Sequence, residues 1–159
     1  MFGKKGIDKV LSDLKKYFAY LFDDGFQIVG SKYDEKHFGN WMTVLYSNKC
    51  IIRIHQDRRQ IVILIGPPWA STNMQEIDHY YDLKLIVAFL EKNESVDFTA
   101  DLQHIDLQYE EISRKLLAHY EQVVQLVNRP DFANVEKELY QLQERVLAKK
   151  FPGLFGKKS

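Results

Sequence analysis

The sequence predicts an α+β fold, with a four-stranded antiparallel meander at about residues 26–66 between an N-terminal helix and three C-terminal helices. Two observations support this class. Between Trp41 and Gly66, three short runs rich in β-branched and aromatic residues follow one another almost without a break: WMTVLYS, CIIRIHQ and QIVILIG. Strands joined this closely must be antiparallel, because a parallel crossover needs about a dozen residues or more. Beyond residue 66 the apolar residues repeat at helical spacing instead.

An amphipathic helix is predicted over residues 5–22. Its apolar residues recur at spacings of three and four, with Lys and Asp on the opposite side: Ile7, Val10, Leu11, Leu14, Tyr17, Phe18, Leu21 and Phe22. The segment Asp23-Asp24-Gly25 ends this helix, since glycine suits the left-handed conformation of a C-terminal cap or turn. Residues 26–33 are predicted as the first strand and residues 34–40 as a polar loop.

The turns of the meander fix its register. A two-residue turn at Asn48-Lys49 and another at Arg58-Arg59 give registers that agree, and both place Ile52 and Ile54 on a clearly apolar face. A loop of odd length at Arg58-Arg59 would instead turn the last strand over and exchange the residues that face inward. The opposite face carries a mixed set of side chains: Met42, Val44, Tyr46, Ile51, Arg53, His55, Val62 and Leu64.

This mixed face is too apolar for water and too polar for a dry core. Either the N-terminal helix covers part of it or a partner does, because uncovered patches of this size are often contact surfaces. Tyr46, Arg53 and His55 are therefore candidate partner-binding residues. Arg58 and Arg59 at the adjacent hairpin tip are candidates as well, since arginine can bind a carboxylate or phosphate in bidentate fashion. A solvated turn is the competing interpretation of that tip.

Helices are predicted for the rest of the chain. Pro67-Pro68 ends the fourth strand, and residues 69–79 form an irregular connection. A short helix runs from about Asp82, a candidate N-cap, to Glu91, and residues 93–100 form a loop.

The last two helices are predicted to pack against each other. A long helix runs from about Asp101 to Asn128, where Arg129-Pro130-Asp131 breaks it. The final helix carries an apolar seam of matching spacing: Val135, Leu139, Leu142 and Val146. Matched seams joined by a short break predict an antiparallel αα-hairpin.

Composition and charge limit the broad class. The 159 residues predict one domain, residues 1–150, followed by a flexible basic tail, residues 151–159. The formal net charge is zero, but residues 67–128 hold eleven acidic residues against four basic ones, between basic ends. The single cysteine, Cys50, excludes an internal disulfide and suits a reducing compartment. With no apolar signal core and no run near the ~20 apolar residues of a membrane span, a cytoplasmic location is predicted.

The sequence contains no common catalytic motif. A glycine-rich phosphate loop and an H-E-x-x-H pattern are both absent. His79 and Asp82 lie three residues apart, but two ligands without a third make a weak metal site. Cys50 and His55 point to opposite faces of their strand, which excludes a nucleophile pair there. We therefore predict no enzymatic activity, metal site or cofactor.

One part of the chain resembles a known group of proteins. The motifs are Phe38-Gly39-Asn40-Trp41, then Ile52-Arg53, then Asp57-Arg58-Arg59-Gln60 with alternating aliphatic residues to Gly66. They resemble a group of small uncharacterised bacterial proteins, some of which are immunity proteins of toxin systems. The resemblance covers about residues 38–66, and the group has glycine at the position of Arg59. It implies a bacterial, cytoplasmic binding protein and transfers no catalytic residue.

The predicted function is that of a protein interaction module, either immunity-like or chaperone-like. Its expected partner is another protein, either a toxin or a second copy of the chain. Zero net charge and the lack of a basic, aromatic platform argue against nucleic-acid and membrane binding. The alternative function is a small-molecule-binding or enzymatic domain with a pocket near Trp69, His79 and Tyr80.

Overall fold

The computed structural model describes residues 2–37, 39–96 and 104–155. It confirms the α+β class, with one antiparallel sheet in the strand order β1-β2-β3-β4-β5. The strands are β1 (Gln27–Asp34), β2 (Asn40–Tyr46), β3 (Ile51–Asp57), β4 (Gln60–Gly66) and the short β5 (Tyr81–Asp82). The helices are α1 (Phe2–Tyr17), α2 (Ala19–Asp23), the 3-10 turn η1 (Glu35–His37), α3 (Leu83–Glu91), α4 (Ile105–Val127), α5 (Phe132–Lys150) and α6 (Pro152–Phe155).

The register predicted from the two turns is confirmed. Leu45 pairs with Ile52 across β2 and β3, and Ile52 pairs with Ile65 across β3 and β4. On the other face, Val44 pairs with Arg53, which pairs in turn with Leu64. Because side chains alternate between faces, these pairings assign every residue of the three strands to one side of the sheet.

The helix predicted over residues 5–22 is interrupted. α1 ends at Tyr17, and Phe18 leaves the helical conformation with φ −119° and ψ 31° before α2 begins. The Tyr17 carbonyl accepts a hydrogen bond of 2.6 Å from the Ser113 hydroxyl of α4, and the Phe18 side chain is fully buried. The interruption therefore ties this segment to α4, a tertiary contact that periodicity does not reveal. The left-handed turn predicted at Gly25 is confirmed by its φ of +95°.

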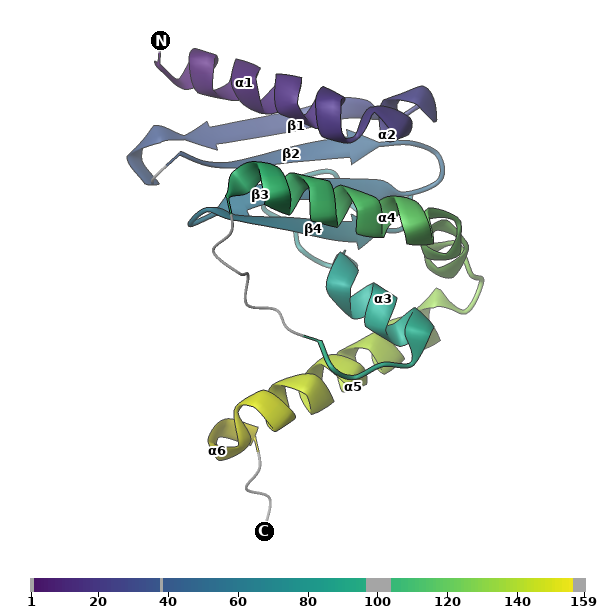
Figure 1. Cartoon of the computed structure of the whole chain (residues 1–159). Coiled ribbons are helices and arrows are strands. Elements are labelled where there is room, and N and C mark those ends of the chain that lie inside the picture. Colours follow the sequence, from purple (N-terminus) through teal and green to yellow (C-terminus); the bar gives the residue numbers. More distant parts are fainter. Residues whose placement is uncertain (1, 38, 97–103, 156–159) are drawn as a thin grey trace.

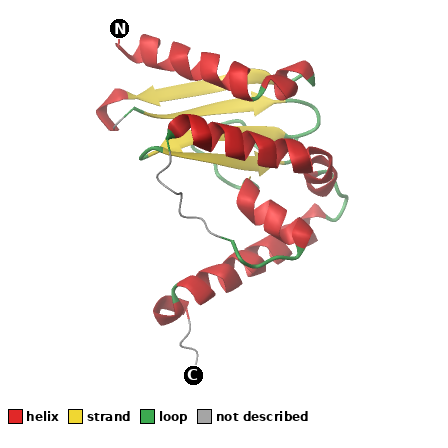
Figure 2. Ribbon diagram, viewed as in Figure 1, coloured by secondary structure: helices red, strands yellow, loops and turns green. Residues whose placement is uncertain are grey.

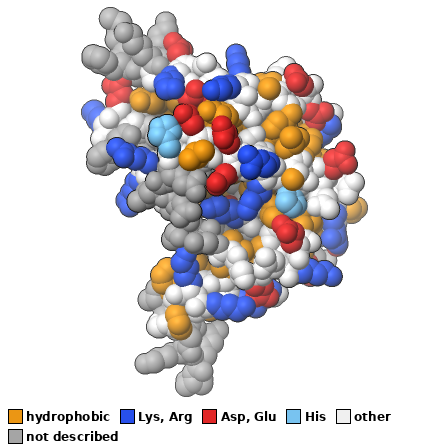
Figure 3. Space-filling view, viewed as in Figure 1, with side chains coloured by type: hydrophobic (Ala, Val, Ile, Leu, Met, Phe, Trp, Pro, Cys, Tyr) orange, Lys and Arg blue, Asp and Glu red, His pale blue; other side chains and the backbone are white. Residues whose placement is uncertain are grey.

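The main core lies between one face of the sheet and the helices. α1 and α4 both contact this face, and Figures 1 and 2 show α4 passing in front of the strands. A stack of aromatic rings joins the two helices to the sheet: Tyr109 of α4 stacks on Tyr17 at 4.8 Å and on Trp41 of β2 at 6.5 Å between centroids. On the outside of this helical layer, Lys and Arg side chains intermingle with Asp and Glu (Figure 3).

The C-terminal helices differ in arrangement from the predicted hairpin. α4 and α5 contact each other, but α3 packs against both of them. Figure 1 shows α5 turning away from α4 and running past α3. The start of α3 is as predicted, because the Asp82 carboxylate accepts a hydrogen bond of 2.8 Å from the Lys84 backbone N–H.

The predicted ends of two segments fall partly outside the described residues. The loop predicted at 93–100 and the helix start predicted near Asp101 include residues 97–103, and the described helix begins at Ile105 with His104 as its N-cap. In the tail predicted as flexible, residues 152–155 form α6, while residues 156–159 lie outside the description.

Among the described helices, none combines the length and the apolar character needed to cross a membrane.

Two adjacent leucines of α4 test which side of this helix faces the core. Leu116 is fully buried, whereas Leu117 is 54 % exposed. We expect Leu116→Ala to lower the free energy of unfolding by about 2–5 kcal/mol, because it leaves a cavity in the core. Leu117→Ala should change it by less than about 0.5 kcal/mol. Urea unfolding of both variants measures the difference, and equal losses would contradict the orientation of α4.

Candidate interaction surface

The second face of the sheet is divided by residues 67–80, which we call the strap. The strap follows β4 and packs a small apolar cluster of its own onto this face: Val44, Ile51, Leu64, Ala70, Met74 and Tyr80. The expectation that α1 or a partner covers this face is therefore wrong for the half beneath the strap. α1 lies in the main core instead, which is formed on the opposite face of the sheet.

Arg53 lies beneath the strap and is fully buried. Its Nη2 atom donates hydrogen bonds to the carbonyl oxygens of Ser71 at 3.1 Å and Asn73 at 2.8 Å. The guanidinium carbon lies 3.7 Å from the ring centroid of Tyr80, whose hydroxyl donates to the Ser71 carbonyl at 2.6 Å. Arg53 thus satisfies strap carbonyls that have no place in a helix or sheet. Its predicted role on an exposed partner-binding face is wrong in this structure, because the side chain is the inner anchor of the strap.

The half of the second face that the strap leaves open forms a groove. Its volume is about 270 Å³, and its lining residues come from β1, β2 and β3: Lys32, Asp34, Asn40, Trp41, Met42, His55, Gln56 and Asp57. His55 is half-buried, and burial lowers its pKa; the nearby Asp57 opposes this shift and Arg53 adds to it. Since the ordinary pKa is 6.5, His55 is mainly neutral at pH 7 and offers this groove one hydrogen-bond donor and one acceptor.

Arg58 and Arg59 form a tight turn beside the groove, which we call the arginine tip. Both residues have left-handed backbones, with φ of 51° and 69°, as a two-residue type I′ hairpin requires. The odd-length alternative is therefore excluded. Both side chains are exposed, and neither guanidinium has an ion-pair partner within the described part of the chain.

The backbone of the arginine tip is held from two sides. On the groove side, the Arg58 N–H donates to the side-chain oxygen of Asn40 at 3.0 Å, and the Asn40 amide donates to Asp57 at 3.2 Å. On the helix side, the Gln108 amide of α4 donates to the Arg59 carbonyl at 2.7 Å and accepts from the Ile61 N–H at 3.0 Å. The turn is thus fixed in place while its two side chains face solvent.

Tyr46 lies apart from the groove and the tip. It is 39 % exposed and pairs with Ile51, at the opposite end of β2 from Asn40. With strands rising ~3.3 Å per residue, it lies roughly 20 Å along the meander from Arg58. Of the five predicted partner-binding residues, His55 therefore lines the groove, Arg58 and Arg59 form the tip beside it, and Arg53 and Tyr46 lie elsewhere.

The residues of the alternative pocket, Trp69, His79 and Tyr80, also separate. Trp69 and His79 are in contact on the outside of the strap, with ring centroids 4.7 Å apart, and Trp69 is 61 % exposed. Tyr80 points to the inside of the strap, onto Arg53. His79 has a left-handed backbone, with φ 74°, and its Nδ1 lies 2.6 Å from a carboxylate oxygen of Glu136 in α5.

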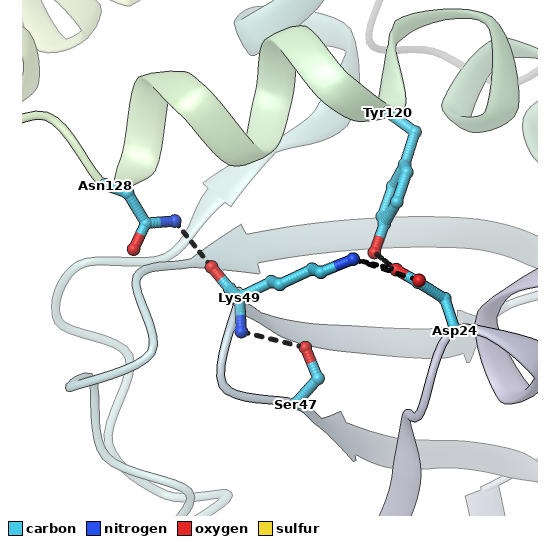
Figure 4. Close-up of polar contacts among 5 residues, drawn as sticks. All are labelled: Asp24, Ser47, Lys49, Tyr120 and Asn128. Carbon is cyan, nitrogen blue, oxygen red and sulfur yellow. Dashed lines mark hydrogen bonds and ion pairs between the residues drawn. The ribbon is translucent and has the colours of Figure 1, made fainter.

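A polar cluster holds the β2–β3 turn against the helices (Figure 4). The Asp24 carboxylate accepts bonds from the Lys49 ammonium at 2.7 and 2.9 Å and from the Tyr120 hydroxyl at 2.5 Å. The Asn128 amide donates to the Lys49 carbonyl at 2.6 Å. Hydrogen bonds from Lys49 and Tyr120 keep the pKa of Asp24 below its ordinary value. The cluster thus joins α2, the turn and α4, which identifies it as a structural tie.

Cys50 lies next to this cluster as a buried free thiol. Burial raises its pKa to about 12, with Asp24 adding to the shift and Lys49 opposing it. The thiolate is therefore almost absent at neutral pH, and the side chain is a small core residue, as its strand position predicts.

Among the described residues, no group of three or more His, Cys, Asp and Glu side chains is placed to hold a metal ion. Comparison of this chain with protein-family models, curated proteins and solved structures yields no match. The resemblance of residues 38–66 to immunity proteins therefore stays a prediction.

Two variants of Arg53 separate its packing from its charge. Arg53→Ala removes both strap hydrogen bonds and leaves a cavity, so we expect it to cost at least about 2 kcal/mol of stability. Arg53→Met keeps most of the volume and removes a buried charge that faces no carboxylate, and it should cost less than about 1.5 kcal/mol. Denaturant unfolding tests this order. A larger loss for Arg53→Met than for Arg53→Ala would contradict the anchoring role.

The Asp24 cluster predicts a dependence of stability on pH. Because the folded pKa of Asp24 is lowered from 3.8, its contribution is complete above that value and is lost as pH falls through the folded pKa. Asp24→Asn should therefore lower the urea midpoint at pH 7, and the gap to the native protein should narrow near pH 3. Parallel curves across this range would show that the carboxylate charge does not contribute.

Proposed function

We propose that this protein is an interaction module that binds an acidic surface of another protein through the arginine tip and the adjoining groove. The observation that carries the proposal is the tip itself, where two arginines occupy strained positions, are held from both sides and have exposed side chains. Within the groove, Lys32 and neutral His55 add polar contacts, and Met42 adds apolar area.

The backbone strain at Arg58 and Arg59 supports a role in binding for their side chains. A left-handed backbone costs roughly 1–2 kcal/mol per residue for residues other than glycine, asparagine and aspartate. Asn-Gly would form the same turn with less strain. Arginine at both positions therefore lowers the stability of the hairpin, and what the chain gains in return is a pair of guanidinium groups at a fixed location.

The fixed backbone also supports tight binding. Ordering a loop during association reduces affinity, and here the hydrogen bonds of Asn40 and Gln108 order it beforehand. Arginine is the residue best suited to an acidic partner, because its planar fork can bind a carboxylate through two parallel hydrogen bonds. It is also enriched among the residues that dominate binding energy at interfaces.

The partner that we propose is a protein of the bacterial cytoplasm, either a toxin or a second copy of this chain. The likeness of residues 38–66 to immunity proteins supports this choice. Binding is favoured over catalysis, because the one cysteine is buried in the main core, on the other side of the sheet from the His55 groove, with its pKa raised to about 12.

Replacing the arginine tip by Asn-Gly tests the proposal. In the double variant Arg58→Asn, Arg59→Gly we expect an unchanged or higher unfolding midpoint, because the strain is relieved. The same variant should bind the partner at least about 30-fold more weakly, equivalent to ~2 kcal/mol. Binding is measured by calorimetry with the protein encoded next to this gene, or with this chain itself.

A matched control removes the same charge elsewhere. Arg114 and Lys115 are exposed on α4, and Arg114→Ala with Lys115→Ala removes two positive charges from the helix side. This variant should bind within about twofold of the native protein. Equal losses in both double variants would mean that net charge, and not the arginine tip, drives the association.

A further inference from the structure

A second surface lies on the outside of the strap. Trp69 is 61 % exposed and Ile77 is 72 % exposed, and Tyr140 of α5 is 61 % exposed. Tyr140 follows Glu136 by four residues, which places the two on the same side of the helix. Glu136 in turn contacts His79, the ring neighbour of Trp69. Ile77 lies in the strap two residues before His79. We call the region formed by Trp69, Ile77, His79, Glu136 and Tyr140 the strap patch.

Trp69 is held firmly although its ring is exposed. His79 packs against it at 4.7 Å and Phe132 at 6.3 Å, both at steep angles to the indole plane. The His79 ring is itself fixed by Glu136 at 2.6 Å, and the inside of the strap is fixed by Arg53. A rigid, exposed tryptophan is typical of the residues that anchor protein interfaces, because little freedom is lost when it is covered.

The strap part of this patch is negatively charged. Residues 67–83 contain Glu76, Asp78 and Asp82 and no Lys or Arg. Asp82 is engaged as the N-cap of α3, while Glu76 and Asp78 flank Ile77 on the exposed side of the strap. Burial raises the pKa of Tyr81 to about 12, and the charges of Glu136 and Asp78 add to the shift, as expected in a negative potential.

We propose that the strap patch binds a basic segment of a partner protein. A Lys or Arg side chain of that segment lies over the Trp69 ring, since tryptophan is the best aromatic partner for a cation. Its aliphatic stem covers Ile77, and its charge lies beside Glu76 and Asp78. This surface is separate from the arginine tip and has the opposite charge, so the inference does not depend on the function proposed above.

The probe for this site is an N-acetylated, C-amidated hexa-arginine peptide, with hexa-glutamate as the control. Native protein should bind hexa-arginine with a change in tryptophan fluorescence that reports Trp69, because Trp41 is only 5 % exposed. Hexa-glutamate should cause no change. Calorimetry gives the affinity of variants in which Trp69 is replaced and its fluorescence cannot be followed.

Two variants of the strap patch and one control variant distinguish binding at this site from non-specific attraction between opposite charges. Trp69→Leu, and Glu76→Gln with Asp78→Asn, should each weaken hexa-arginine binding at least tenfold. Glu110→Gln with Glu111→Gln removes two exposed carboxylates from α4 and should change it less than twofold. The Asn-Gly variant of the arginine tip should bind the peptide normally. Unfolding midpoints confirm that each variant is folded, and the carboxamide variants alter only surface side chains.

Three outcomes would overturn the inference. Equal losses in the strap and α4 carboxamide variants would show a non-specific charge effect. An unchanged affinity in Trp69→Leu would show that the indole ring takes no part. Concentration-dependent dimers in sedimentation velocity that Trp69→Leu abolishes would show that a second copy of this chain covers the patch.

Discussion

The register of the meander is the constraint on which the rest of this structure depends. Two turns of two residues, at positions 48–49 and 58–59, place Ile52, Ile63 and their neighbours on the helix side. The same turns place Arg53 on the other side, opposite Val44 and Leu64. A shift by one residue would bury Arg53 in the main core and expose the isoleucines, so the position of the strap follows from the length of a turn.

The positive charge of Arg53 on that second face needs polar partners, and the strap supplies two carbonyl oxygens. An isolated guanidinium in an apolar setting is costly, and here two main-chain carbonyls bind Nη2 and the Tyr80 ring lies against the guanidinium carbon. Among the described residues, its Nε and Nη1 atoms have no hydrogen-bond partner, so the compensation is partial. Because the carbonyls belong to residues 71 and 73, the contact orders a segment with no regular structure of its own. Its outer side then presents Trp69 and Ile77 in fixed positions.

Local signals predicted most of the fold, and long-range contacts account for what they missed. Turn length predicted the register, Gly25 the end of the first helical region and Asp82 the start of α3. The strap has no sustained periodicity: its inward residues Ala70, Met74 and Tyr80 are four and six residues apart, which continues neither a helical nor a strand pattern. The same limit applies to the site. The alternation of side chains along the strand predicted that Arg53 and His55 share one face of the sheet. It could not predict that the strap covers Arg53 and leaves His55 in the open groove.

The distribution of backbone strain separates the candidate surfaces from the scaffold. Among the described residues, four that are not glycine have left-handed backbones: Arg58, Arg59, His79 and Lys92. Lys92 has an ordinary reason, because it ends α3 with its N–H bonded to the Phe89 carbonyl. The other three lie at the arginine tip and beside Trp69, where no helix end requires them. Strain that persists is held by its surroundings, here Asn40 and Gln108 at the tip and Glu136 at His79. Both strained sites are thus fixed by side chains from other elements, as expected where the position of an exposed side chain matters more than local stability.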